Sequence, residues 1–352
     1  MEFGMFHEFL RAKGQTEADA FDAAFEIIDA AEAHGLDAMW IAELHVAPER
    51  SVAAAPLTLA AAIAQRTKRM KIGIAVQVLP LCHPLQLAEE VTTVDHLSRG
   101  RLIFGVGRSG FPRTYEAYGV PYGESRERFA ETLDILKQAW TQEKFSYEGR
   151  WHSFKDVCLV PKPYQQPYPE LRVAATSADT FPVNGAAGYP IFCAVRFGTL
   201  SELGPNLKAY QDAWRAAGHP GRGKVYLRVP VYVAATEARA RSEPQESIME
   251  FYRYLGARIE ESATLDGARP EEQRAERGAR LQAITWDEVL RDKIIVGTPE
   301  QVAARLNGLR DELGLDGILA ELNCGSRIPH ASVLESLRLL CRDVMPMTRQ
   351  PA

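Results

Sequence analysis

The chain of 352 residues is predicted to fold as an α/β protein, a (β/α)8 or TIM barrel, on three observations. Short apolar strands alternate with amphipathic helices, which is typical of a parallel sheet covered by helices. Eight such units can be counted, and eight fit a closed barrel better than an open doubly wound sheet. No GxGxxG follows the first strand, which weighs against a dinucleotide-binding fold. Residues 1–352 are therefore assigned to one domain.

The first two units occupy the N-terminal part of the chain. The strand Glu2–Phe6 is short and apolar, and the helix Ala18–His34 repeats apolar side chains at helical spacing until Gly35 stops it. The second strand, Leu36–Leu44, has an apolar centre, and the alanine-rich segment Pro56–Gln65 is the second helix. Each strand is thus followed by a helix, as a βα unit requires.

The third and fourth units have the same order. The strand Met70–Leu79 is rich in Ile and Val and stops at Pro80, and the helix Pro84–Leu97 carries its apolar residues on one face. The strand Arg101–Val106 runs into glycines, and a long amphipathic helix follows over Glu124–Trp140.

Two insertions interrupt this rhythm. Phe145–Lys162 is expected to form a hairpin that turns at Gly149, after the fourth helix. Ser242–Leu290, after the seventh strand, is long, charged and helical. Both segments lie outside the strand–helix alternation, so we expect them to decorate the barrel.

The remaining units complete the count of eight. The expected strands are Leu171–Ala175, Pro190–Val195, Val225–Ala234 and Gly317–Leu322. The expected helices are Asp179–Ala187, Ser201–Ala217, Thr298–Leu313 and His330–Val344. Pro299 stands at the first turn of its helix, where proline is favoured.

Composition excludes several classes of function. The formal net charge of −5 provides no electrostatic footprint for nucleic acid or an anionic membrane surface. No apolar run is long enough to span a membrane, and no secretory signal is visible at the N-terminus. Five cysteines without a CxxC pair indicate neither a zinc ribbon nor a disulfide framework, and no cluster has metal-ligand spacing. These features favour a cytoplasmic protein without a metal site.

One candidate site follows from the rule that barrel chemistry lies at the C-terminal ends of the strands. Ser177 and Thr180 flank the start of the fifth helix, where free backbone N–H groups and the helix dipole favour a phosphate. Arg108, after the fourth strand, adds a planar fork of donors suited to phosphate. Ser177 as a plain helix cap and Arg108 as a solvated loop residue remain the alternatives.

A second candidate lies at the end of the second strand. Glu43 and His45 are expected to point toward the barrel mouth, where a carboxylate can set the tautomer of an imidazole and tune its basicity. A buried histidine satisfied by its neighbour is the alternative, and neither is favoured. His83, before Pro84, is more simply a structural turn residue than a base.

At these residues the sequence resembles the bacterial luciferase-like flavin monooxygenases, nearly from end to end. Gly35–His45 resembles their motif GFDxxWxxEHH, and Val78–Arg101 resembles VLPxxHPxxxAEDVxxxDxxSxGR. Gly105–Arg108, Val296–Glu300 and Asp343–Pro346 match further motifs in the same order. Each motif alone is weak, whereas the ordered set is specific.

The resemblance implies a barrel that binds reduced FMN at its mouth and uses O2 to oxygenate a small organic substrate through a flavin C4a-peroxide. By position it assigns the FMN phosphate to Arg108, Arg126, Ser177 and Thr180. We expect Glu43, His45 and His83 to line the catalytic mouth, with His45 the best candidate for proton transfer. The family often has a cis non-proline peptide against the flavin ring, which falls here at Ala75-Val76.

The resemblance also implies partners. No site for NAD(P)H is visible, so a separate flavin reductase is expected to supply reduced FMN. Ser242–Leu290 falls where the family has a mobile lid. Members pair through the second and third helices, which here are Pro56–Gln65 and Pro84–Leu97, and their abundant alanine and apolar residues favour a two-fold homodimer.

Two departures from the family pattern leave alternatives open. Leu44 replaces the first of two adjacent histidines, which is taken as the catalytic base in the luciferases, and Gly107 stands at the position of their reactive cysteine. The light-emitting aldehyde reaction is therefore not expected. General monooxygenation stays possible because oxygen activation belongs mainly to the flavin. The alternatives are an F420-dependent oxidoreductase and a non-catalytic flavin-binding subunit.

Overall fold

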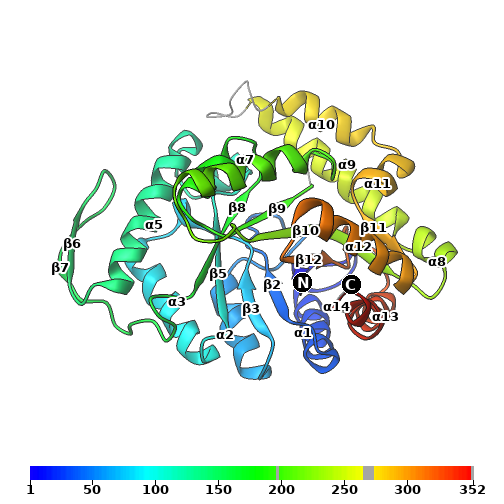
Figure 1. Ribbon diagram of the computed structural model, residues 1–352, viewed down its shortest axis with the longest axis horizontal. Helices are drawn as coiled ribbons and strands as arrows, with labels where there is room; N and C mark the ends of the chain where they lie inside the picture. Colours follow the sequence, from blue (N-terminus) through cyan, green and yellow to red (C-terminus); the bar gives the residue numbers. More distant parts are fainter. Residues whose placement is uncertain (196–197, 265–272, 350–352) are drawn as a thin grey trace.

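Eight parallel strands close into a barrel in the computed structural model, which describes residues 1–195, 198–264 and 273–349 (Figure 1). In chain order they are β1 (Glu2–His7), β2 (Ala38–Ile41), β3 (Lys71–Ile74), β5 (Leu102–Gly107), β8 (Glu170–Ala175), β9 (Ile191–Ala194), β10 (Val225–Val233) and β12 (Gly317–Glu321). Each pairs with the next, and β12 pairs with β1 to close the ring. The predicted TIM barrel is confirmed.

Helices surround this ring and bury their apolar faces against it. They are α1 (Glu17–His34), α2 (Pro56–Arg66), α3 (Pro84–Ser98), α5 (Ser125–Thr141), α6 (Thr180–Ala186), α7 (Leu203–Ala216), α12 (Pro299–Leu313) and α13 (His330–Leu339). Local sequence sets their ends. Thr16 and Asp19 form a capping box at the start of α1, and Gly35 ends that helix with φ 89°.

The third strand differs from its prediction because it is broken. The run Met70–Leu79 forms β3, a short β4 (Gln77–Val78) and the start of a 3-10 turn at Leu79–Leu81. The Ala75-Val76 peptide between β3 and β4 is cis, at the position that the resemblance indicated.

The hairpin insertion is confirmed and is fastened to the barrel. Strands β6 (Phe145–Glu148) and β7 (Ser153–Val157) pair antiparallel beside α5 (Figure 1). The carboxylate of Glu131 on α5 accepts the backbone N–H groups of Arg150, Trp151 and His152. One side chain therefore holds the tip of the hairpin.

The insertion after β10 is helical. Its helices are α8 (Glu237–Ser242), α9 (Gln245–Glu261), α10 (Arg274–Gln282) and α11 (Trp286–Asp292), and residues 265–272 of the predicted segment lie outside the described residues. Three elements were not expected: α4 (Pro112–Ala117), the short strand β11 (Ile295–Gly297) on the end of β10, and α14 (Met345–Arg349) after a π-helical turn. Among the described residues, no helix is both long and apolar enough to cross a membrane.

One large side chain, Trp40 of β2, fills the centre of the barrel. It is fully buried, and glycines on the neighbouring strands make room for it. A Cβ atom added at Gly4 or Gly73 would lie 2.6 or 2.2 Å from the indole ring. Below it, Arg172 stacks on Trp40 and binds Glu2 at the N-terminal end of the barrel. The interior is thus packed up to the mouth, where the chemistry must take place.

Candidate active site at the barrel mouth

The mouth is built from two unlike halves. On β3, β5 and β8 the inward positions near the strand ends are Ala75, Gly105, Gly107 and Ala174, which have little or no side chain. A Cβ atom at Gly107 would lie 2.7 Å from Val76 Cγ2, so this position accepts only glycine without a shift of its neighbour. We call these four residues the small-residue half. Because these residues have so little side chain, backbone and methyl groups form the floor of this half.

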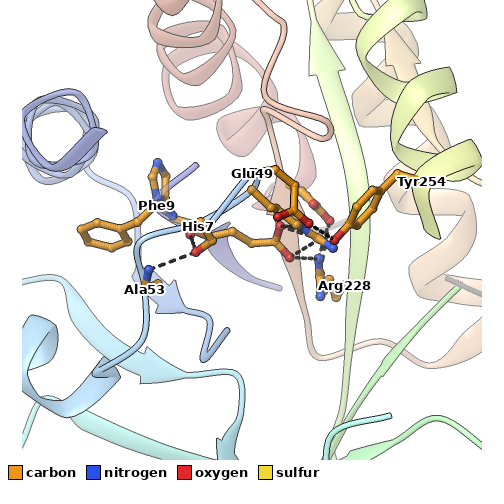
Figure 2. A network of polar contacts seen from close by, with 10 residues as sticks. His7, Phe9, Glu49, Ala53, Arg228 and Tyr254 are labelled. Carbon is orange, nitrogen blue, oxygen red and sulfur yellow. Dashed lines mark hydrogen bonds and ion pairs between the residues drawn. The ribbon is translucent and has the colours of Figure 1, made fainter. Parts of the chain in front are cut away.

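The opposite half, formed around β1, β10 and β12, contains a buried ionic network (Figure 2). Arg50 donates from Nε and Nη2 to Glu8 at 2.8 and 2.7 Å, and Arg228 Nη2 donates to Glu8 at 3.2 Å and to Glu321 at 2.8 Å. All four side chains are buried or nearly so. We call Glu8, Arg50, Arg228 and Glu321 the charged half. Its two carboxylates balance its two guanidinium groups.

The insertion after β10 rests on this charged half. Arg50 lies 5.1 Å from the ring centre of Phe251 on α9, and the hydroxyl of Tyr254 donates to Glu49 at 2.9 Å (Figure 2). Across the mouth, Arg274 of α10 donates to the carbonyl of Gly110 and to the hydroxyl of Tyr122. The inserted helices therefore contact loops on both sides of the mouth.

Glu43 and His45 are brought together, as predicted. His45 Nε2 lies 2.6 Å from Glu43 Oε1, and Glu43 Oε2 accepts hydrogen bonds from Gln77 Nε2 at 2.8 Å and from the Val78 N–H at 2.7 Å. A further group completes the cluster, because the Tyr118 hydroxyl lies 2.9 Å from His45 Nδ1. Leu44, which lies between Glu43 and His45 in the sequence, packs against the barrel interior instead.

His83 lies apart from this pair. It precedes α3, and its ring packs against His152 and Phe154 of the hairpin at 5.5 and 6.0 Å between centroids. A cavity of about 220 Å³ opens there, lined in part by Cys82, His83, Arg128 and His152. Cys82 lies between this cavity and the Glu43 cluster. Burial, and secondly the negative charge of Glu43, raise the pKa of the Cys82 thiol to about 12. Cys82 therefore stays protonated and is no nucleophile at neutral pH.

The predicted phosphate residues also gather on one side of the mouth. Arg108 Nη1 donates to Ser125 Oγ at 3.0 Å, and Arg126 pairs with Asp179 at 2.7 Å. Burial, and then the proximity of Arg126, lower the pKa of Arg108. Two guanidinium groups thus share a single neighbouring carboxylate.

Ser177 and Thr180 close the same corner. Thr180 donates from both its backbone N–H and its hydroxyl to the carbonyl of Ser177, at 2.9 and 2.6 Å. The Ser177 hydroxyl and Arg126 lower the pKa of Asp179 through hydrogen bonds, against the effect of burial. Thr180 is the first residue of α6. The corner thus brings Ser177 and Thr180, which follow β8, to the same side of the mouth as Arg108, which follows β5.

Sequence reasoning missed several members of the mouth. Tyr118 and Gln77 contact the Glu43–His45 pair, and Arg50 and Arg228 build the charged half. The one available signal was position: Glu8 and Glu321 both fall at the ends of barrel strands. Among the described residues no group of three or more His, Cys, Asp or Glu side chains is arranged to hold a metal ion.

Comparison with known proteins places these features in a family. Residues 1–317 match the luciferase-like monooxygenase family. The chain is 25% identical to the oxygenase component of a flavin-dependent trigonelline monooxygenase from Acinetobacter baylyi, over 98% of this chain and 95% of that protein. It is 27% identical to an F420-dependent glucose-6-phosphate dehydrogenase from Kineococcus radiotolerans, over 80% and 81% of the two chains.

A solved structure shows the same fold. The oxygenating constituent of 3,6-diketocamphane monooxygenase from Pseudomonas putida, a type II Baeyer–Villiger enzyme in complex with FMN, superposes with a TM-score of 0.83 at 22% identity, over 100% of this chain and 99% of that one. With the family match covering most of the sequence, the chain belongs to the luciferase-like monooxygenase family and is an oxidoreductase, as its motifs implied.

Proposed function

We propose that this protein is an FMN-dependent monooxygenase that receives reduced FMN and uses O2 to oxygenate a small organic substrate. The observation that carries this proposal is the corner formed by Arg108 and Arg126. Two partly buried guanidinium groups with one neighbouring carboxylate, which pairs with Arg126, form a site with an excess of positive charge that suits a dianionic phosphate.

The rest of the mouth fits an FMN molecule anchored at that corner. The small-residue half adjoins Arg108 along β5, and a planar ring would lie on its backbone and methyl groups. Its glycines open no space themselves, because Cβ atoms at Gly105 and Gly107 would meet Ile74 O at 1.9 Å and Val76 Cγ2 at 2.7 Å. Ala75 and Val76 lie at the edge of this floor. When bound, FMN would supply the chemistry of oxygen activation. Arg108, Arg126, Ser177 and Thr180 would hold its phosphate, with Ala75 and Val76 against its ring.

The chain's own residues would manage protons and water around that ring. Glu43 holds His45 through Nε2, which leaves Nδ1 as the nitrogen that can accept a proton. Helices α9 and α10 would act as a mobile lid that covers the mouth and excludes water, and residues 265–272 of the expected lid lie outside the described residues. A catalytic role for His83 stays a prediction, since its ring faces the hairpin.

The first experiment tests the phosphate corner with two opposed substitutions. Arg108→Met should weaken FMN binding roughly 10- to 150-fold, because hydrogen bonds to charged groups contribute about 1.5–3 kcal/mol. Asp179→Asn should instead strengthen binding severalfold, since it frees Arg126 and removes a negative charge. Fluorescence titration of both variants checks this. Equal affinity in wild type and Arg108→Met would place the phosphate elsewhere.

A second measurement separates FMN from F420, because an F420-dependent relative is also similar to this chain. The protein is titrated with each reduced cofactor, and O2 consumption is followed with FMN bound. We expect tight binding of reduced FMN and O2-dependent oxidation. Preference for F420 without O2 uptake would support the alternative of a deazaflavin oxidoreductase, and binding of flavin without any turnover would support a non-catalytic subunit.

Partners follow from the same proposal. A separate reductase supplies reduced FMN, which agrees with the description of the trigonelline relative as an oxygenase component. We infer a cytoplasmic location from the five cysteines, whose spacing indicates no disulfide framework. We also infer a homodimer through α2 and α3. Most of their apolar residues, including Ala60, Ala64 and Val91, are already buried within one chain, so an interface would use the partly exposed Leu59, Ala61 and Leu85.

A further inference from the structure

The imidazole of His45 is held on both of its nitrogens. Glu43 Oε2 accepts from the Val78 N–H, which can only donate, so the Glu43 carboxylate acts as acceptor on that side. Its other oxygen faces His45 Nε2 at 2.6 Å, which places the ring proton of neutral His45 on Nε2. Nδ1 is then the acceptor, and the hydroxyl 2.9 Å away must donate to it. That hydroxyl belongs to Tyr118, 73 residues along the chain.

Tyr118 also lies between His45 and water. Its residue is 47% exposed, whereas the His45 side chain is 10% exposed. The two rings are in contact, with centroids 4.9 Å apart and an interplanar angle of 58°. Tyr118 directly follows α4, in the loop from β5 that also carries Arg108. The charged or titratable groups that face this phenol are His45, Glu43 and Cys82.

We propose that Tyr118 positions His45 and is the outer member of a proton relay between solvent and the barrel mouth. In one passage, the Tyr118 O–H bond breaks as a bond from that proton to His45 Nδ1 forms. The phenolic oxygen takes a replacement proton from hydronium, which leaves as water. His45 then releases its Nε2 proton to Glu43 Oε1, 2.6 Å away, so the net change is one proton moved from solvent to the Glu43 carboxylate, and Tyr118 and His45 each again hold one exchangeable proton. The relay rests on the proposed function, whereas the positioning of His45 does not.

This role differs from that of Glu43. Glu43 fixes which nitrogen carries the ring proton, but it lies on the inner side of the imidazole, bound to Gln77 and Val78. Tyr118 contacts Nδ1, the ring nitrogen on the solvent side, so proton exchange between Nδ1 and water must pass through the phenolic oxygen or displace it. The residue at position 44, a leucine packed on the barrel interior, offers no substitute.

Two variants test the proposal. Tyr118→Phe removes the hydroxyl and keeps the ring, and Tyr164→Phe is the matched control, because Tyr164 is an exposed tyrosine that packs against another histidine, His96, at 5.6 Å. In flavin-free protein, 15N spectra of the histidine rings should show His45 protonated on Nε2. Tyr118→Phe should shift the Nδ1 resonance of His45, and Tyr164→Phe should not. An unchanged His45 spectrum in Tyr118→Phe would overturn the positioning role, whether or not the protein binds flavin.

The relay is tested by the rate at which O2 reoxidises bound reduced FMN, followed by flavin absorbance. Tyr118→Phe should slow this rate about tenfold, less than the loss of a direct general acid or base, and small imidazole buffer should restore it while FMN affinity stays unchanged. A merely structural tyrosine would not respond to buffer. If the His45 spectrum changes but the rate is neither lowered nor buffer-dependent, Tyr118 positions His45 and the relay is wrong.

Discussion

The two halves of the barrel mouth, built at the ends of different strands, differ in how their charged groups are paired. In the charged half, Glu8, Arg50, Arg228 and Glu321 neutralise one another. In the small-residue half, Gly105 and Gly107 have no side chain, and no carboxylate of the described residues is in hydrogen-bond contact with the adjoining Arg108. In the first half each charged group has an oppositely charged partner, although Glu321 Oε1 is buried with no hydrogen-bond partner among the described residues. Pairing of charge, more than depth in the barrel, therefore distinguishes the two halves.

The largest effect should come from breaking the charged half. Arg228→Met leaves Glu8 and Glu321 buried with one cation between them, and removal of one partner from a buried pair costs about 3–5 kcal/mol. Urea unfolding measures the loss. Arg66→Met is the control, because its pair with Asp29 is 47% exposed on both sides and should change stability by about 1 kcal/mol or less. Equal losses of unfolding free energy in Arg228→Met and Arg66→Met would show that the buried network stabilises the fold no more than an exposed ion pair does.

The next effect concerns pH beside the same half. Burial lowers the pKa of His7 from 6.5 to about 4. Between pH 6.5 and 4, His7 is therefore protonated in the unfolded chain and neutral in the folded chain. Stability therefore falls as the pH falls from 6.5 to 4, by about 1.4 kcal/mol per unit and roughly 3 kcal/mol in all. His7→Asn, which keeps an acceptor for the Phe9 N–H, should flatten this part of the curve.

His96→Asn is the control for that measurement. His96 is exposed and its ring contacts the carbonyl of Lys162. This variant should leave the slope between pH 6.5 and 4 unchanged. An equal flattening in both variants would mean that His7 is not the group responsible.

The smallest of these effects belongs to the other half. Gly107→Ala places a methyl group 2.7 Å from Val76 Cγ2, so Val76 must move into the proposed flavin floor. Overpacking of this kind costs about 1–3 kcal/mol, and we expect FMN affinity to fall by roughly five- to 150-fold. Gly110→Ala, with no heavy atom within 4 Å, is the matched control. Unchanged affinity in Gly107→Ala would remove this glycine from the flavin floor.

The alternation of apolar strands with helices was sufficient to predict the barrel, because the spacing of apolar residues distinguishes a strand from a helix within each short segment. It missed β11, which has only three residues, and it read β3 and β4 as one strand, because the cis peptide between Ala75 and Val76 leaves no mark on hydrophobicity. The resemblance to a family supplied that position.

The site divides in the same way. Glu43 and His45 are two residues apart, so their contact could be expected from the strand end that carries both. Tyr118 lies 73 residues from His45, and Arg228 lies 220 residues from Glu8. Contacts at such separation depend on how the barrel closes, and no periodicity within a single sequence encodes them. The contacts of the charged half could therefore be identified only from the three-dimensional structure.

The packing of Trp40 has a consequence for how this sequence can change. The indole occupies the volume that side chains at positions 4 and 73 would otherwise fill, on the strands to either side. A substitution of either glycine alone collides with the ring, and a smaller residue at position 40 alone leaves a void. The residues at positions 4, 40 and 73 should therefore covary. In related barrels, glycine at positions 4 and 73 should accompany tryptophan at position 40, and larger residues should occur at 4 and 73 only where the tryptophan has been replaced.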